Sequence, residues 1–165
     1  MMSEMTKSVS RPAHAPDPAG RGDGVRAPLT MDDYVPYQLA LLSSRLSREL
    51  EAVYGESHGL SRTEWRTLAL VGEFGESAAT AVVERSGMDA VAVHRAVKRL
   101  EETGLIQRVS SSADKRLKPL RLTPAGAASY QAIVPHALDL ERRLLARLLP
   151  DEVRILRKVL AKLLS

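Results

Sequence analysis

Basic side chains are concentrated in one stretch of this 165-residue chain, and they are the residues with the clearest chemistry. Residues 88–122 carry eight Lys or Arg against four Asp or Glu, whereas residues 31–87 carry five against nine. The whole chain has a net charge of only +4, so this one stretch holds an excess as large as the total. A basic surface beside an acidic one favours binding of a polyanion, with nucleic acid as the first candidate. The alternative is a solvated Lys/Arg face without a ligand.

The sequence lacks the residue patterns that several other functions require. It contains no Cys, which excludes a disulfide scaffold, a thiolate zinc site and a thiol nucleophile or redox sensor. It has no Gly-rich phosphate loop, no Ser nucleophile elbow and no paired carboxylates in a plausible cleft. Its four His are too dispersed for a metal site: His14, His58, His94 and His136. We therefore expect neither an enzyme nor a bound cofactor or metal.

Length and composition predict one globular domain with an N-terminal tail. The apolar fraction of 44% is enough for a core. No run approaches the roughly 20 apolar residues of a membrane span, and the first residues lack the apolar stretch of a signal peptide. We therefore expect a cytoplasmic protein without a membrane partner.

Residues 1–29 are rich in Pro and Gly without apolar periodicity, which predicts a disordered tail.

Helices that would position the basic stretch begin near residue 31. Leu residues recur at three- and four-residue spacings and predict a helix over about 31–54, with Thr30 as its N-cap. A break follows around Gly55 and Gly59. Ser61-Arg62-Thr63-Glu64 then forms a capping box that starts a second helix, which ends between residues 72 and 75.

Two further helices and a hairpin complete the middle of the chain. Ser77 is expected to cap a short helix over 78–85, and Asp89 a helix that reaches residue 103. Short extended segments at 105–109 and 119–122 then flank a polar, basic stretch, which predicts a β-hairpin with a long tip. Helix, turn, helix and hairpin are the plan of a winged helix-turn-helix. We predict a mainly α, α+β fold with this winged domain at residues 60–123.

The ends of the chain are more apolar than such a small domain needs. Thr123-Pro124 starts a long helix to about Leu148, bent near Pro135, and Asp151 is expected to cap a last helix to about Leu164. Nine apolar residues there exceed local needs: Leu144, Leu145, Leu148, Ile155, Leu156, Val159, Leu160, Leu163 and Leu164. We expect residues 30–59 and 124–165 to form the dimerisation region of a homodimer, and the alternative is packing within one chain.

The order of these features over residues 31–165 resembles the MarR family of bacterial transcription regulators. The motifs that carry the resemblance are Leu60-Ser61-Arg62-Thr63-Glu64-Trp65-Arg66, the recognition helix from Met88 to Glu101, Gly104-Leu105-Ile106, Asp114-Lys115-Arg116 and Leu122-Thr123-Pro124-Ala125-Gly126. The resemblance implies a homodimer whose two recognition helices enter successive major grooves of a palindromic operator in double-stranded DNA. We expect a nucleoid-associated repressor, with small-molecule control as in many members.

The resemblance assigns roles on the recognition helix. Arg95 falls where the family has a common Arg, and a bidentate contact to guanine suits it. Lys98 and Arg99 are expected to contact phosphates, and His94, where Ser is common, a base or a phosphate. The alternative for all of them is a solvated face.

The first turn of that helix departs from the family. It carries Ala90, Val91 and Ala92 where polar residues are common. Hydrogen-bond donors are therefore scarce in this turn, which favours apolar contact with a thymine methyl group.

The predicted wing carries Asp114 and Arg116, which match the family's Asp-x-Arg pair. A carboxylate two residues away orients the guanidinium, which then enters the narrow, electronegative minor groove. Lys115 and Lys118 are expected on backbone phosphates. A simple solvated turn is the alternative.

An effector site is predicted from topology alone. Family members often bind ligands between the dimer helices and the winged domain, and Tyr37, His58 and Trp65 are candidates to line such a crevice for a phenolic or aromatic acid. For Trp65 itself, core packing with a satisfied indole N–H is the favoured role. A competing function for the whole chain is a winged-helix protein–protein interaction module without direct DNA binding.

The wing assignment is tested by Arg116→Ala. We expect operator affinity to fall at least about tenfold, or about 1.4 kcal/mol, because the minor-groove contact is lost. A gel-shift titration at physiological salt measures it, and unchanged affinity would contradict the assignment.

Overall fold

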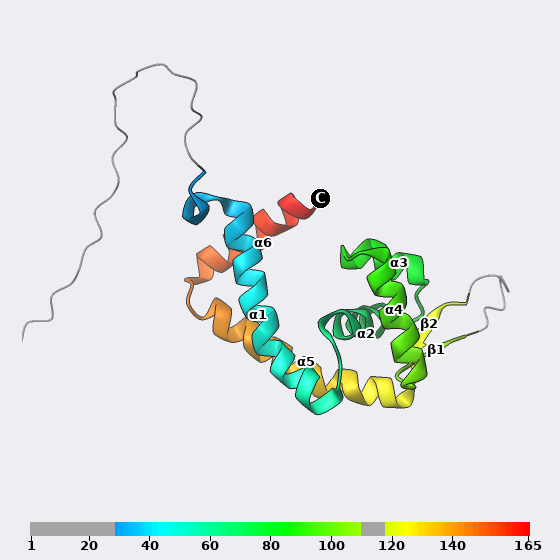
Figure 1. Ribbon diagram of the computed structural model, residues 1–165. Helices are drawn as coiled ribbons and strands as arrows, with labels where there is room; N and C mark the ends of the chain where they lie inside the picture. The colour runs from blue at the N-terminus through cyan, green and yellow to red at the C-terminus, as the bar shows by residue number, and fades with distance from the viewer. Residues whose placement is uncertain (1–28, 110–117) are drawn as a thin grey trace, which may run out of the picture.

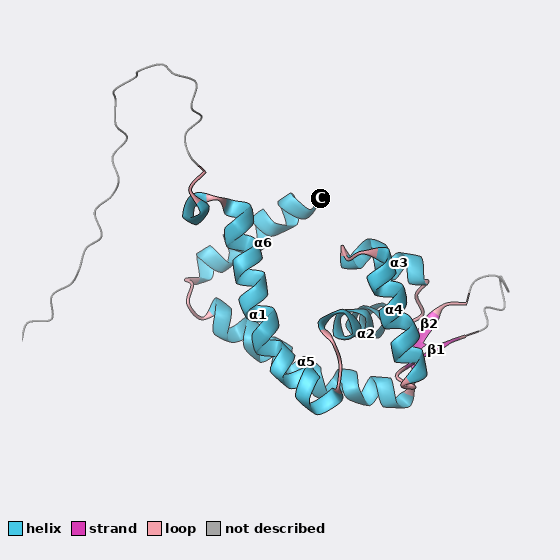
Figure 2. Ribbon diagram, viewed as in Figure 1, coloured by secondary structure: helices cyan, strands magenta, loops and turns pink. Residues whose placement is uncertain are grey.

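A computed structural model describes residues 29–109 and 118–165 of the chain (Figure 1). Its elements in order are η1 (Met31–Asp33), α1 (Val35–His58), α2 (Arg62–Phe74), α3 (Ala79–Ser86), α4 (Ala90–Glu102), β1 (Ile106–Arg108), β2 (Leu120–Leu122), α5 (Pro124–Leu145) and α6 (Pro150–Leu164). Figure 2 shows a mainly helical chain whose described part has one small antiparallel sheet. The predicted fold class is confirmed.

The helices are arranged in two groups that α5 connects. Figure 1 shows α2, α3, α4 and the hairpin gathered at one side, and α1 with α6 at the other. α5 starts beside the hairpin, contacts α2 and then runs along α1. The first group therefore holds the recognition helix, and the second holds the apolar ends of the chain.

The core lies inside the first group and at its junction with α1 and α5. α4 packs on α2 and α3, and the fully buried side chains come from all of these elements. In the hairpin Ile106 pairs with Leu122 and Arg108 with Leu120, so Ile106 and Leu120 both point into the core. Burial of each large apolar side chain stabilises the fold by about 1.5–3 kcal/mol.

Three predicted helix starts are confirmed. Ser61 Oγ accepts from Glu64 N at 3.3 Å while Glu64 Oε2 accepts from Ser61 N at 2.7 Å, which is a complete capping box. Asp89 Oδ1 accepts from Ala92 N at 3.0 Å at the start of α4. Thr123 Oγ1 accepts from Gly126 N at 3.0 Å, and Pro124 takes the first position of α5.

The first helix differs from its prediction at both ends. Thr30 precedes the short η1 turn and makes no side-chain capping bond, and α1 begins only at Val35 after Tyr34. At the other end α1 continues through Gly55 to His58, because it is Gly59, with φ of 63°, that adopts the left-handed conformation that ends the helix.

The caps expected at Ser77 and Asp151 are wrong. Ser77 exchanges two backbone hydrogen bonds with Leu120, at 2.8 and 3.0 Å, so it extends the hairpin and Ala78 precedes α3. Leu149 precedes α6, where Glu152 accepts from its backbone N–H at 2.8 Å and Asp151 lies in the first turn. α5 continues through Pro135 but ends at Leu145, short of the predicted Leu148.

Two close contacts fix α5 to the winged group. Trp65 stacks between Tyr54 of α1 and Tyr130 of α5, with ring centroids 6.1 and 6.3 Å away. At the start of α5, Gly126 approaches the hairpin so closely that an added Cβ would lie 1.9 Å from the carbonyl oxygen of Leu105.

The close approach of Gly126 to Leu105 predicts that Ala substitutions at Gly126 and Gly55 have opposite effects on stability. Gly126→Ala should lower the free energy of unfolding by at least about 2 kcal/mol, because α5 must move away from the hairpin. Gly55→Ala is the matched control, since its Cβ would meet nothing closer than 3.9 Å. It should raise stability by up to about 1 kcal/mol through helix propensity. Urea unfolding measures both, and equal effects would contradict the prediction.

Candidate nucleic-acid interface

The recognition helix α4 has one buried face and one exposed basic face. Val93, Ala96, Val97 and Leu100 are at most 4% exposed. One turn holds 3.6 residues, so the opposite side of α4 carries residues 91, 95 and 98, with 94 and 99 on its two flanks. Val91, His94, Arg95, Lys98 and Arg99 are all exposed, as is Ala90, whereas Ala92 is half-buried.

The cations of α4 are available for a ligand. Within the described ranges, Arg95, Arg99 and His94 form no ion pair, and Lys98 has only a 3.9 Å contact with Glu102 on the exposed surface. Such an exposed pair contributes little to stability. The face therefore presents positive charge that the fold itself does not neutralise.

The base of the hairpin is held by two ion pairs. Arg108 Nε lies 2.9 Å from Glu101 of α4, and Arg121 Nη1 lies 3.2 Å from Glu76 before α3. Lys118 is exposed where the chain returns toward β2. The residues expected at the tip, Asp114, Lys115 and Arg116, lie outside the described residues.

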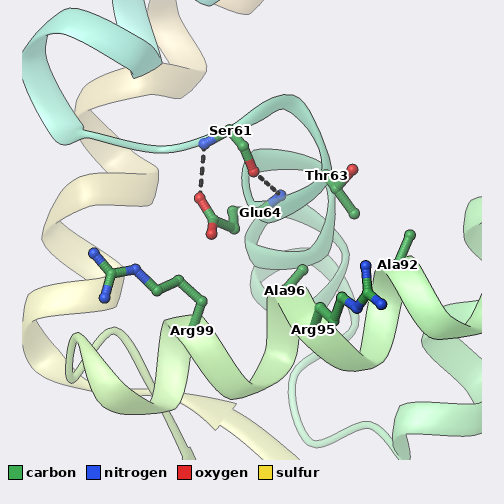
Figure 3. Close-up of a pocket in the computed structure, with 7 residues that line it drawn as sticks. All are labelled: Ser61, Thr63, Glu64, Ala92, Arg95, Ala96 and Arg99. Carbon is green, nitrogen blue, oxygen red and sulfur yellow. Dashed lines mark hydrogen bonds between the residues drawn. The ribbon is translucent and has the colours of Figure 1, made fainter.

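A groove of about 370 Å³ lies between α4 and the start of α2. Figure 3 shows Ala92, Arg95, Ala96 and Arg99 in this order along α4, beside the first turn of α2, with Ala96 between the two arginines. The α2 side of the groove is formed by Ser61, Thr63 and Glu64. Sequence reasoning treated these three only as a helix cap. Ala92 and Ala96 are four positions apart on the same flank of α4 as Arg99, and this spacing of small residues could have predicted the groove.

A smaller cavity of about 160 Å³ lies where α1, α2 and α5 meet. Its lining combines apolar, aromatic and basic side chains: Leu46, Ser47, Leu50, Tyr54, Arg62, Trp65, Arg66 and Leu140. The Tyr54 hydroxyl is buried and has no hydrogen-bond partner among the described residues. Burial raises the pKa of Tyr54, which is therefore neutral. Burial lowers the pKa of Arg66, and the positive charge of the neighbouring Arg62 lowers it further.

The three residues expected to line an effector crevice are not all brought together. Trp65 lines the cavity, but Tyr37 and His58 do not. These two lie 21 positions apart on α1, which corresponds to about 30 Å along a helix axis. Sequence reasoning missed Tyr54, Arg62 and Arg66. Arg62 and Arg66 are four positions apart on α2, on either side of Trp65 in the sequence. This spacing could have predicted that both cations lie beside Trp65.

Neither described range contains a helix that is long and apolar enough to cross a bilayer. In the same two ranges, no three His, Asp or Glu side chains gather in a way that would hold a metal ion.

Comparison with known proteins gives consistent results. A family model described as MarR family matches residues 58–117. A curated relative, the HTH-type transcriptional repressor IacR of Pseudomonas putida, is 24% identical over 93% of each chain. A solved structure described as a probable transcriptional regulator from Pseudomonas aeruginosa is 33% identical over 81% of this chain and 99% of that one, with a TM-score of 0.67.

Two further solved structures share the fold. A MarR/EmrR family transcriptional regulator from Acinetobacter sp. ADP1 is 28% identical over 82% of this chain and 95% of that chain, with a TM-score of 0.75. A MarR family regulator from Listeria monocytogenes, solved with a 26-mer DNA, is 21% identical over 79% and 87%, with a TM-score of 0.74.

Proposed function

Because this chain belongs to the MarR family of winged-helix, DNA-binding transcriptional regulators, we propose that it is a homodimeric repressor of a palindromic operator. In this proposal α4 and the wing contact DNA, and an aromatic acid releases it. The observation that carries the proposal is the exposed face of α4, whose arginines have no partner in the described part of the fold.

Base reading is assigned to the outward centre of α4. Arg95 extends from the side opposite the core and is free of ion pairs within the described residues, which suits a bidentate contact to guanine. Val91 is 56% exposed one turn earlier, so its methyl groups are placed for a thymine methyl. The side chains of Ala90 and Ala92 are short, so they add little bulk to the first turn of α4. Lys98 extends the basic surface toward the phosphates.

The wing and the flanks of α4 complete the proposed contacts. Arg116, oriented by Asp114, enters the minor groove, and Lys115 and Lys118 contact phosphates. The ion pair between Arg108 and Glu101 supports this assignment because it fixes the hairpin to α4. The DNA-bound Listeria monocytogenes structure with the same fold supports DNA as the partner. His94 is proposed to contact a base or phosphate on the flank of α4.

The dimer is proposed from exposed apolar surface at both chain ends. Large apolar side chains that are 37–85% exposed occur before and within α1, in α5, and just before and within α6: Leu29, Met31, Tyr34, Val35, Tyr37, Leu39, Leu42, Leu138, Leu148, Leu149, Ile155, Val159, Leu160, Leu163 and Leu164. Surfaces of this extent are rare on monomers. A second copy of the chain covers them in the proposal, and the two α4 helices then address two half-sites.

The effector is assigned to the cavity between α1, α2 and α5. Arg62 and Arg66 supply charge for a carboxylate, while Trp65 and Tyr54 supply aromatic surface. The unpartnered Tyr54 hydroxyl offers a hydrogen bond to a polar ligand. An aromatic acid matches this combination, because it carries one planar apolar ring and one anionic group. Ligand binding would shift the dimer between DNA-competent and incompetent states.

DNA binding is tested by a salt titration with a selected operator duplex. The slope of log K against log salt should be steep, because several phosphates are neutralised in each half-site. Arg95→Ala should reduce operator affinity by about 1–3 kcal/mol and relax the preference at one base pair. Arg48→Ala, exposed on α1 outside the winged domain, is the control and should leave affinity unchanged. A flat salt response would count against DNA as the partner.

Effector binding is tested with benzoate and 2-hydroxybenzoate as probes. Trp65 is the only Trp in the chain, so saturable quenching of its fluorescence reports occupancy of the cavity. Arg66→Gln should weaken binding about tenfold, or about 1.4 kcal/mol, through loss of a charged contact. Arg154→Gln on α6 is a charge-matched control. Absence of saturable quenching by either acid would contradict the cavity assignment.

A further inference from the structure

Val91 is an apolar side chain on a helix face that otherwise carries cations. It is 56% exposed in the first turn of α4 and lies on the outward side of the helix, in line with Arg95 and Lys98. We propose that Val91 binds the C5-methyl group of a pyrimidine whichever base carries it, so that the protein accepts 5-methylcytosine in place of thymine and its DNA binding responds to cytosine methylation. This inference rests on the proposed function and adds a chemical modification of DNA to what α4 distinguishes.

The fold itself gains nothing from a valine at this position. Val91 is more than half exposed and lies outside the hydrophobic core. A β-branched residue on an exposed helix surface is also less favourable for the helix than alanine. Phe74, the other large apolar side chain that stays well exposed in residues 60–109 and 118–123, has its ring covered by Arg85 at 4.1 Å. The place of Val91 on the outward side of α4 therefore points to an apolar group on a ligand.

The first turn of α4 favours the edge of a base over a phosphate. Asp89 caps the helix, and its Oδ1 accepts the backbone N–H of Ala92 at 3.0 Å. This carboxylate places negative charge at the N-terminus of the helix, which opposes an approaching phosphate. Ala90 and Ala92, on either side of Val91, have no hydrogen-bonding group in their side chains. Apolar contact through Val91 is therefore what the side chains of this turn offer to a base.

The C5 position of pyrimidines is where bases present an apolar group in the major groove. Thymine and 5-methylcytosine both carry a methyl group there, although thymine has an acceptor at O4 and cytosine a donor at N4. Uracil keeps the acceptor of thymine but lacks the methyl group. A valine has no hydrogen-bonding group with which to distinguish O4 from N4. Val91 therefore groups thymine with 5-methylcytosine, and uracil with cytosine.

The rigidity of valine suits this contact. A β-branched side chain in a helix has one strongly preferred χ1 rotamer, so the two methyl groups of Val91 are held in place before DNA binds. Little side-chain entropy is then lost in binding. Burial of one methyl group should raise affinity about fourfold in each half-site, which corresponds to about 0.8 kcal/mol. The effect should be the same at two salt concentrations, because a methyl contact releases no counterion.

The test measures the effect of the methyl group in two kinds of base pair. In an operator duplex selected with the wild-type protein, each thymine is replaced in turn by uracil, at matching positions of both half-sites. At one position this should weaken binding about fourfold per half-site. That A·T pair is then changed to a G·C pair with cytosine or 5-methylcytosine, and the methylated duplex should bind about fourfold more tightly per half-site. The purine is constant within each comparison, so only the methyl group differs.

Two variants of the full-length protein assign the contact to Val91. Val91→Ile keeps an apolar, β-branched side chain and should keep both methyl effects. Val91→Ser removes the apolar surface, and both effects should disappear, because the changes in protein and DNA remove the same contact. Both variants should fold as the wild-type protein does, since position 91 is exposed and lies outside the core.

Three results would overturn the inference while the proposed function stands. The first is that the wild-type protein binds the operator and no replacement of thymine by uracil weakens binding. The second is that 5-methylcytosine binds no better than cytosine at the responsive position. The third is that both methyl effects persist in Val91→Ser, which would assign the methyl contact to another residue. If the wild-type protein does not bind DNA, the proposed function itself fails.

Discussion

The burial of one face of α4 is the constraint on which the rest of the structure depends. Val93, Val97 and Leu100 are at most 1% exposed against α2, α3 and the hairpin, and each contributes about 1.5–3 kcal/mol of burial free energy. Since the face is fixed, the rotation of the helix is fixed as well. Arg95 and Lys98 are consequently directed to solvent, and no further interaction is needed to present them to a ligand.

The junction between the two helical groups fixes the position of α2 relative to α1 and α5. Trp65 of α2 lies between Tyr54 of α1 and Tyr130 of α5, while Gly126 lets the start of α5 approach the hairpin. α2 therefore borders the cavity on one side, through Arg62 and Arg66, and the groove beside α4 on the other, through Thr63 and Glu64. A ligand that displaces α2 would change both sites together, which gives the proposed release a physical route.

Local chemistry made part of this structure predictable. The cap at Ser61, the cap at Asp89 and the start at Thr123 each depend on residues within three positions of one another, and all three are confirmed. Ser77 was mispredicted because its partner, Leu120, is 43 positions away. The exposed face of α4 follows from helical periodicity. The groove and the cavity do not, because they depend on how α2 is placed against α4, α1 and α5.

The distribution of exposed apolar side chains separates two kinds of surface. In residues 60–109 and 118–123, the large apolar side chains that remain well exposed are Phe74 and Val91, and Arg85 covers the ring of Phe74 at 4.1 Å. Val91 is thus left as an apolar group among cations, a place that suits a base methyl group. Tyr37 belongs instead to the long apolar series at the chain ends. In the proposed dimer a second copy of the chain covers Tyr37, which does not line the α1–α2–α5 cavity.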